Sequence, residues 1–93
     1  MTDPPRAEGF AIGLAEARRK MADLVAANPG DTWLLSIQRQ LDAVAGWTRG
    51  GQWPERAQVE KLSFGVLASR SVDELDPELA QLLYRLAGEL DRG

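Results

Sequence analysis

Four leucines near the end of the chain constrain the fold more than any other feature. Leu79, Leu83, Leu86 and Leu90 recur at spacings of four and three residues. Such spacing places them on one face of an amphipathic α-helix. The chain holds thirteen leucines beside two isoleucines and five valines, a ratio that favours helix over sheet. The sequence therefore predicts an all-α protein, and its 93 residues suit one compact domain, residues 1–93.

Two earlier segments repeat this spacing. A first helix is expected from about Asp3-Pro4 to just before Asn28-Pro29-Gly30, because a capping residue followed by proline starts a helix and a Pro-Gly turn ends one. Its apolar stripe is Phe10, Leu14, Ala17, Met21, Leu24 and Val25. A second helix is expected over residues 31–48. Its stripe is Leu34, Ile37, Leu41 and Val44.

A third helix is expected to begin at Pro54, after the helix-breaking pair Gly50-Gly51. It is unusual because apolar residues fall on two nearly opposite faces. One face carries Val59, Leu62 and Val66, and the other carries Ala57, Phe64 and Ala68. This helix is therefore either sandwiched in the centre of the protein or contacted by a partner. With the leucine-rich helix, the sequence predicts a compact antiparallel bundle of about four helices.

The segment before the last helix is strongly acidic. Residues 73–93 carry six acids against two bases, whereas residues 1–72 carry eight acids against nine bases. Part of this charge has a structural explanation, since Ser71 with Glu74 matches a capping box and Asp76-Pro77 matches a second helix start. Four acids exceed what capping needs, so Asp73, Glu74, Asp76 and Glu78 could also meet a basic partner. Helix capping is the favoured interpretation.

The three tryptophans allow two interpretations as well. Trp33 and Trp47 fall together at the margin of the second stripe, and Trp53 lies just before Pro54. Large aromatic residues with a polar edge are enriched at interface hot spots, but they also seal the rim of a small core. The sequence leaves both possibilities open.

Several classes of function are disfavoured by what the sequence lacks. Without histidine or cysteine, the chain has neither the commonest neutral-pH base nor a thiolate, so we expect no enzyme. No motif for a metal ion or cofactor occurs. The net charge of −3, with one basic cluster at residues 18–20, argues against nucleic-acid binding. No apolar run fits a signal peptide or a membrane span, so we expect a cytoplasmic protein.

Short blocks along residues 20–90 also carry a family resemblance. They are Asn28-Pro29-Gly30, Trp33-Leu34-Leu35-Ser36, Gln40-Leu41, Leu62-Ser63-Phe64-Gly65, Ala68, Glu74, Asp76-Pro77-Glu78-Leu79 and Leu83. In order and spacing this set resembles the immunity proteins of bacterial type VI secretion that neutralise an NAD-degrading effector toxin. The resemblance implies a small helical cytoplasmic protein that binds the toxin domain and blocks its active site. The glycine-rich loop at residues 47–53 departs from the pattern, which leaves the identity of the toxin open.

The leading hypothesis is therefore an immunity protein whose partner is a cognate toxin, an NAD(P)+ glycohydrolase or a similar nucleotide-consuming enzyme. The residues predicted to contact it are Asp73, Glu74, Asp76, Glu78, Phe64, Trp33, Trp47 and Trp53. The alternative hypothesis is a self-associating helical module that forms a homodimer through the second apolar face of the third helix. A DNA-binding regulator is disfavoured by the acidic balance.

Overall fold

The computed structural model describes residues 6–92, which contain four α-helices of eight or more residues. The elements are α1 (Arg6–Ala27), α2 (Thr32–Trp47), a 3-10 turn η1 (Arg49–Gly51), α3 (Arg56–Val59), α4 (Phe64–Ser71) and α5 (Pro77–Arg92). The described residues contain no strand. The expectation of an all-α bundle of about four helices is confirmed.

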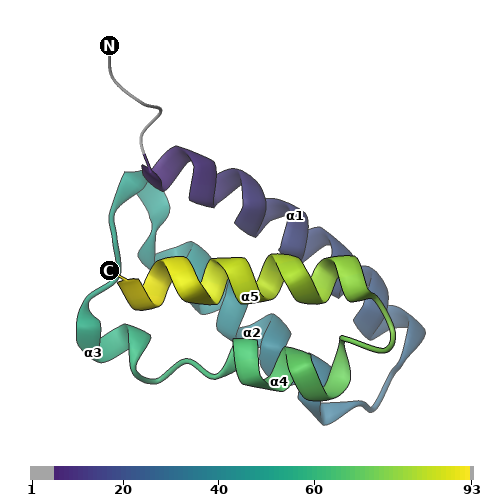
Figure 1. Ribbon diagram of the computed structural model, residues 1–93. Helices are drawn as coiled ribbons and strands as arrows, with labels where there is room; N and C mark the ends of the chain where they lie inside the picture. The colour runs from purple at the N-terminus through teal and green to yellow at the C-terminus, as the bar shows by residue number, and fades with distance from the viewer. Residues whose placement is uncertain (1–5, 93) are drawn as a thin grey trace.

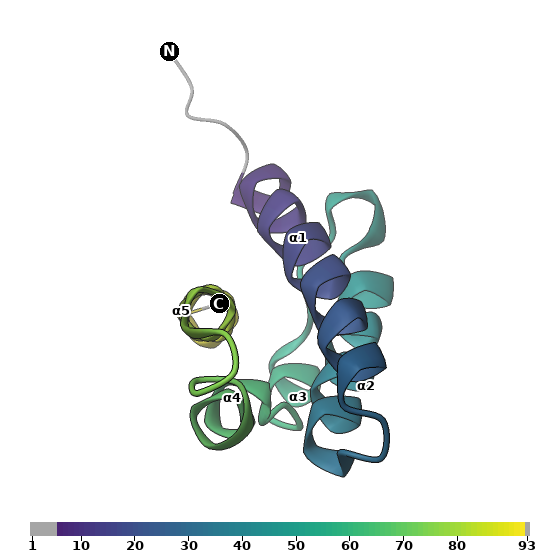
Figure 2. The same ribbon diagram turned by 90° about the vertical axis from the view of Figure 1, so that its right-hand side faces the viewer.

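The long helices form a closed ring of neighbours. Helix α1 packs against α2 and α5, and α4 packs against the same two helices from the other side. Consecutive long helices run in opposite directions, so the turn between α1 and α2 and the turn between α4 and α5 lie at the same end of the bundle, on the right in Figure 1. Figure 2 looks onto this end. The beginning of α1 and the end of α5 lie at the opposite end (Figure 1).

The predicted stripes of α1, α2 and α5 make most of the core. The fully or almost fully buried apolar residues are Phe10, Leu14, Ala17, Met21, Leu34, Ile37, Leu41, Val44, Phe64, Ala68, Val72, Leu79, Ala80, Leu83, Leu86 and Leu90. Two glycines allow the helices to approach closely. A Cβ on Gly13 would lie 3.0 Å from the Arg85 guanidinium, and one on Gly65 would lie 3.0 Å from the Ala87 Cβ.

The prediction of one continuous third helix is wrong. The chain leaves helical geometry after α3 and resumes it only at Phe64. The side chain of Gln40, on α2, holds the break: its Oε1 accepts a hydrogen bond from the Ser63 backbone N–H at 2.7 Å, and its Nε2 donates to the Ser63 hydroxyl at 3.1 Å. Because the break reorients α4, Phe64 is only 1% exposed, whereas Val66 is 60% exposed. The residues predicted on two faces of one helix therefore divide between two short segments. Val59 and Leu62 are partly buried before the break, and Phe64 and Ala68 are buried after it.

Of the two caps predicted before the last helix, Asp76 is confirmed and Ser71 is not, and α2 has a cap that was not predicted. Asp31 begins α2, and its carboxylate accepts from the N–H groups of Trp33 at 3.0 Å and Leu34 at 3.2 Å. Asp76 likewise accepts from the Leu79 N–H at 3.1 Å at the start of α5. The predicted capping box at Ser71 is wrong, because Ser71 ends α4 and its hydroxyl donates to a carbonyl within that helix at 2.8 Å. The expected start of the first helix, at Asp3-Pro4, lies outside the described residues.

Candidate functional site

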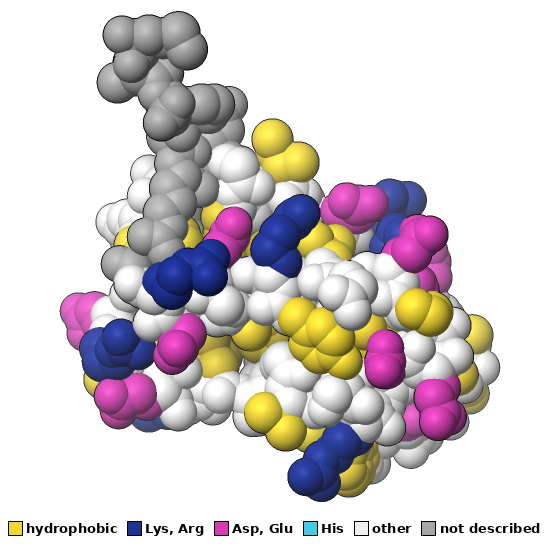
Figure 3. Space-filling view, in the orientation of Figure 1, with side chains coloured by type: hydrophobic (Ala, Val, Ile, Leu, Met, Phe, Trp, Pro, Cys, Tyr) yellow, Lys and Arg dark blue, Asp and Glu magenta, His cyan; other side chains and the backbone are white. Residues whose placement is uncertain are grey.

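The end of the bundle that holds both turns carries an exposed hollow, here called the Trp33 hollow. Its lining residues are Asp31, Trp33, Arg70, Ser71, Glu74 and Leu75. Trp33 is 41% exposed and Leu75 is 50% exposed, so two large apolar side chains face solvent at one place. Several acidic side chains lie at the same end on the face shown in Figure 3. The hollow thus combines an aromatic surface with carboxylates.

Tertiary packing, not local sequence, assembles the Trp33 hollow. Trp33 comes from the first turn of α2, whereas Arg70 is near the end of α4 and Leu75 lies in the following turn. The Arg70 guanidinium lies over the Trp33 ring, 5.9 Å from its centroid. Asp31 is already engaged by two backbone N–H groups. Glu74 is therefore the carboxylate of this hollow that takes no part in capping α2.

The four predicted acidic residues do not converge on one site. Asp73 lies close enough to Tyr84 of α5 for its charge to affect that phenol. Glu74 lines the Trp33 hollow. Asp76 caps α5 and shares a shallow hollow with Arg19 and Lys20 of α1.

Glu78, the fourth of these acids, lines a different hollow between α1 and α5. Lys20 and Arg85 lie in that hollow too. The acidic segment therefore wraps around the α4–α5 turn. Basic residues of α1 and α5 lie beside Glu78, and basic residues of α1 lie beside Asp76.

The neighbourhood of Asp73 gives a pH-dependent prediction. Burial raises the pKa of the Tyr84 phenol above its ordinary value of 10.0, and the charge of Asp73 raises it further. A raised pKa means that the folded state favours the protonated phenol. The stabilisation that Tyr84 contributes through this shift is present below about pH 10, and it is lost as the pH rises through the folded-state pKa of the phenol.

Because Tyr84 is the chain's one tyrosine, its ionisation can be followed by ultraviolet absorbance without interference from another. We expect a titration midpoint above 10 and a lower midpoint in the Asp73→Asn variant. Glu60→Gln, which removes an exposed acid elsewhere on the surface, is the matched control and should leave the midpoint unchanged. An unchanged midpoint in Asp73→Asn would contradict the placement of that carboxylate.

The other two tryptophans pack against the core. Trp47 is partly buried at the end of α2, and 14 residues of helix place it about 21 Å from Trp33. Trp53 is also partly buried, and its ring meets the Phe10 ring edge-on with centroids 5.1 Å apart and an interplanar angle of 67°. The three tryptophans are therefore spread over the molecule, and Trp33 is the one that the structure leaves most exposed.

Phe64 does not fit its predicted role as a contact residue. Its ring is 1% exposed and belongs to the core, because the break before α4 turns it inward. The sequence indicated an apolar face here, but it did not show where the helix breaks or which face is buried. We therefore leave Phe64 out of the surface proposed below.

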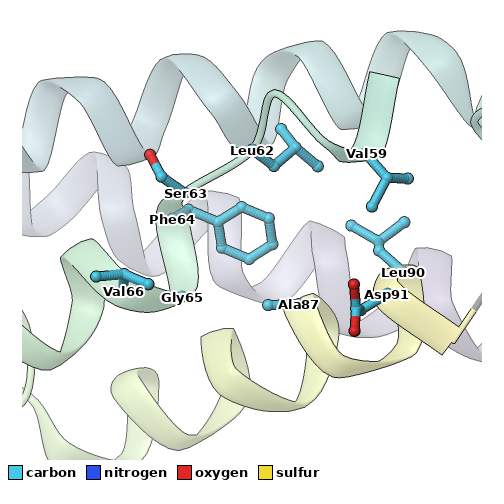
Figure 4. Close-up of a pocket in the computed structure, with 9 residues that line it drawn as sticks. All are labelled: Val59, Leu62, Ser63, Phe64, Gly65, Val66, Ala87, Leu90 and Asp91. Carbon is cyan, nitrogen blue, oxygen red and sulfur yellow. The ribbon is translucent and has the colours of Figure 1, made fainter. Parts of the chain in front are cut away.

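A second hollow, which sequence reasoning missed, lies between the α3–α4 connection and α5. Its volume is about 190 Å3, and its lining is mainly apolar: Val59, Leu62, Ser63, Phe64, Gly65, Val66, Ala87, Leu90 and Asp91. Figure 4 shows Val59 and Leu62 on one side and Leu90 and Asp91 facing them from α5. Small-molecule sites usually measure about 300–1,000 Å3, so this hollow fits a single side chain better than a nucleotide.

No group of three or more acidic residues within the described part of the chain is placed to hold a metal ion. Between residues 6 and 92, no helix combines the length and apolar character needed to cross a bilayer.

The fold and these hollows define a small all-α protein with an exposed hollow lined by aromatic and acidic residues. Residues 10–91 match the family model described as Tsi6. The match spans most of the 93 residues, so the chain belongs to the Tsi6 family of type VI secretion immunity proteins. Membership makes it an immunity protein whose partner is a toxin. Searches of curated proteins and of solved structures returned no match.

Proposed function

We propose that this protein acts in the cytoplasm, where it neutralises an NAD(P)+-hydrolysing toxin by covering the toxin's active site. Membership of the type VI immunity family is the observation that carries the proposal. The inhibitor needs no chemistry of its own, because filling the entrance to an active site is enough to exclude the substrate. Nothing in this mechanism requires a metal ion or a cofactor.

The charge distribution supports this choice of target. An enzyme that binds a dinucleotide must attract phosphates, so its cleft is expected to present basic groups. This chain has a net charge of −3, and four of its acids, Asp73, Glu74, Asp76 and Glu78, lie in the turn between α4 and α5 or in the first turn of α5. Opposite charges on two partners raise the rate of encounter and favour the correct orientation. The acidic end of the bundle is thus a suitable surface to enter such a cleft.

The test requires the cognate toxin domain, which is to be sought among the products of the neighbouring genes. Purified toxin is incubated with NAD+ or NADP+, and loss of the dinucleotide is followed by absorbance after enzymatic reduction. We expect one equivalent of this protein to abolish hydrolysis, because a tight inhibitor titrates its enzyme stoichiometrically. Heat-denatured protein is the control. Hydrolysis that continues at full rate with a molar excess of folded protein would rule out the proposed function.

Self-association is a second candidate, and one observation favours it. Val66 is 60% exposed and lines the apolar hollow between the α3–α4 connection and α5, so a second copy of this chain could cover both. Sedimentation velocity at micromolar concentration distinguishes the two cases. A dimer that the Val66→Asp variant disrupts would support self-association through this hollow, whereas a strict monomer would exclude it.

A further inference from the structure

We propose that the Trp33 hollow receives a basic segment of the cognate toxin, with Trp33 and Leu75 as apolar anchors and Glu74 as the carboxylate that selects for positive charge. This assignment rests on the proposed function, because it takes the cognate toxin as the occupant. Of the eight contact residues predicted from the sequence, this assignment keeps Trp33 and Glu74, which line the same hollow.

The apolar part of the argument begins with exposure. Among the described residues, four large hydrophobic side chains are exposed: Ile12, Trp33, Val66 and Leu75. Trp33 and Leu75 line one hollow, although 42 positions separate them in the chain. Tryptophan is the residue type most enriched at the centres of protein interfaces, where neighbouring side chains exclude water from it. A partner that covers Trp33 would bury Leu75 at the same time.

The charged part of the argument identifies the occupant. Two carboxylates, those of Asp31 and Glu74, line the hollow beside the single guanidinium of Arg70. Arg70 already lies over the Trp33 ring, which shows that a cation is accommodated on this aromatic face. An arginine or lysine of the partner would find the same ring and a carboxylate within one hollow.

Charge also argues against a second copy of this chain in the hollow. A twofold-symmetric dimer places the same patch of both subunits face to face. Glu74 of one copy would then approach Glu74 of the other, and like charges brought together in an interface disfavour association. The surface is therefore better suited to a basic partner than to itself.

The first test measures how the purified full-length protein and its variants bind the immobilised toxin domain. Trp33→Ala should weaken binding by about 30-fold or more, mainly through faster dissociation, as expected for a hot-spot residue. Ile12→Ala is the matched control, because Ile12 is 68% exposed on the first half of α1. Circular dichroism melting of each variant separates lost binding from lost folding.

The second test measures association rates for charge variants. Glu74→Lys should slow association by about tenfold or more at low salt and by less at high salt. Glu60→Lys makes the same change in net charge, from −3 to −1, at an exposed site away from the hollow. Arg70→Gln removes the positive charge of the hollow and should speed association.

The outcomes separate this assignment from the proposed function. Failure of the unaltered protein to bind or inhibit the toxin would overturn both. Tight binding by the unaltered protein and by Trp33→Ala alike would overturn the assignment alone. Faster association of Glu74→Lys, or slower association of Arg70→Gln, would mean that the hollow meets an acidic segment. If the unaltered protein is a dimer and Trp33→Ala is not, the occupant of the hollow is a second copy of this chain.

Discussion

Replacing Phe64 by alanine is expected to lower the free energy of unfolding by about 3 to 5 kcal/mol, as deletion of a buried aromatic ring usually does. The ring is 1% exposed and lies where α4 faces α5, so its removal leaves a cavity next to the existing 190 Å3 hollow. Domains of this size commonly have a total stability of about 5 to 15 kcal/mol. Urea denaturation followed by circular dichroism gives the change directly.

Val66→Ala is the matched control for this experiment. Val66 lies two residues further along the same helix and is 60% exposed, so its truncation should change the stability by about 0.5 kcal/mol or less. A continuous helix with Val66 in the core would give a large loss for Val66→Ala. Equal losses in the two variants would contradict the break that separates α3 from α4.

The second large effect is expected at Trp53. Trp53→Ala should lower the free energy of unfolding by about 2 to 3 kcal/mol, somewhat less than for a fully buried aromatic because Trp53 is only partly buried. The substitution removes the edge-on contact with Phe10, which joins the loop after η1 to the first half of α1. Thermal and urea denaturation measure the loss.

Trp33→Ala gives the contrasting case. Trp33 is 41% exposed and its main described partner is the Arg70 guanidinium, a contact worth about 0.5 to 1 kcal/mol at an exposed site. We expect Trp53→Ala to reduce stability but leave the toxin affinity of the folded fraction unchanged, and Trp33→Ala to do the reverse. The opposite pattern would assign the contact role to Trp53.

Periodicity was sufficient to predict the core faces of the three longest helices. Leu34, Ile37, Leu41 and Val44 are all fully buried along α2, as their spacing indicates. These three helices could be predicted because each is long enough for its apolar stripe to repeat over several turns, and because each buries only one face. The cap at Asp76 was also predicted correctly, since a capping side chain acts within three residues of its own position.

The break between α3 and α4 could not be predicted in the same way. Gln40 holds it from α2, and 23 residues separate Gln40 from Ser63 in the chain. Local propensity contains no information about a side chain that reaches across the bundle. The two apolar faces predicted for a continuous helix were the one available sign, and the two explanations considered for them were a central position in the bundle and contact with a partner.

The candidate site was predictable in its components but not in its geometry. Helix capping accounts for Asp76 in the structure, and exposure distinguishes Trp33 from Trp47 and Trp53. The sequence could not show that Glu74 and Trp33 share a hollow, because the α4–α5 turn and the start of α2 meet only through tertiary packing. It also could not show that Asp76 and Glu78 face basic residues of α1.

The orientation of the bundle has a practical consequence for anyone who attaches this protein to something else. The beginning of α1 and the end of α5 lie together at the end away from the Trp33 hollow (Figure 1). A sensor chip, a fluorescent label or a fused enzyme joined beyond either helix would leave the opposite pole of the molecule accessible. One protein molecule could therefore be tethered by either end and still leave the Trp33 hollow accessible.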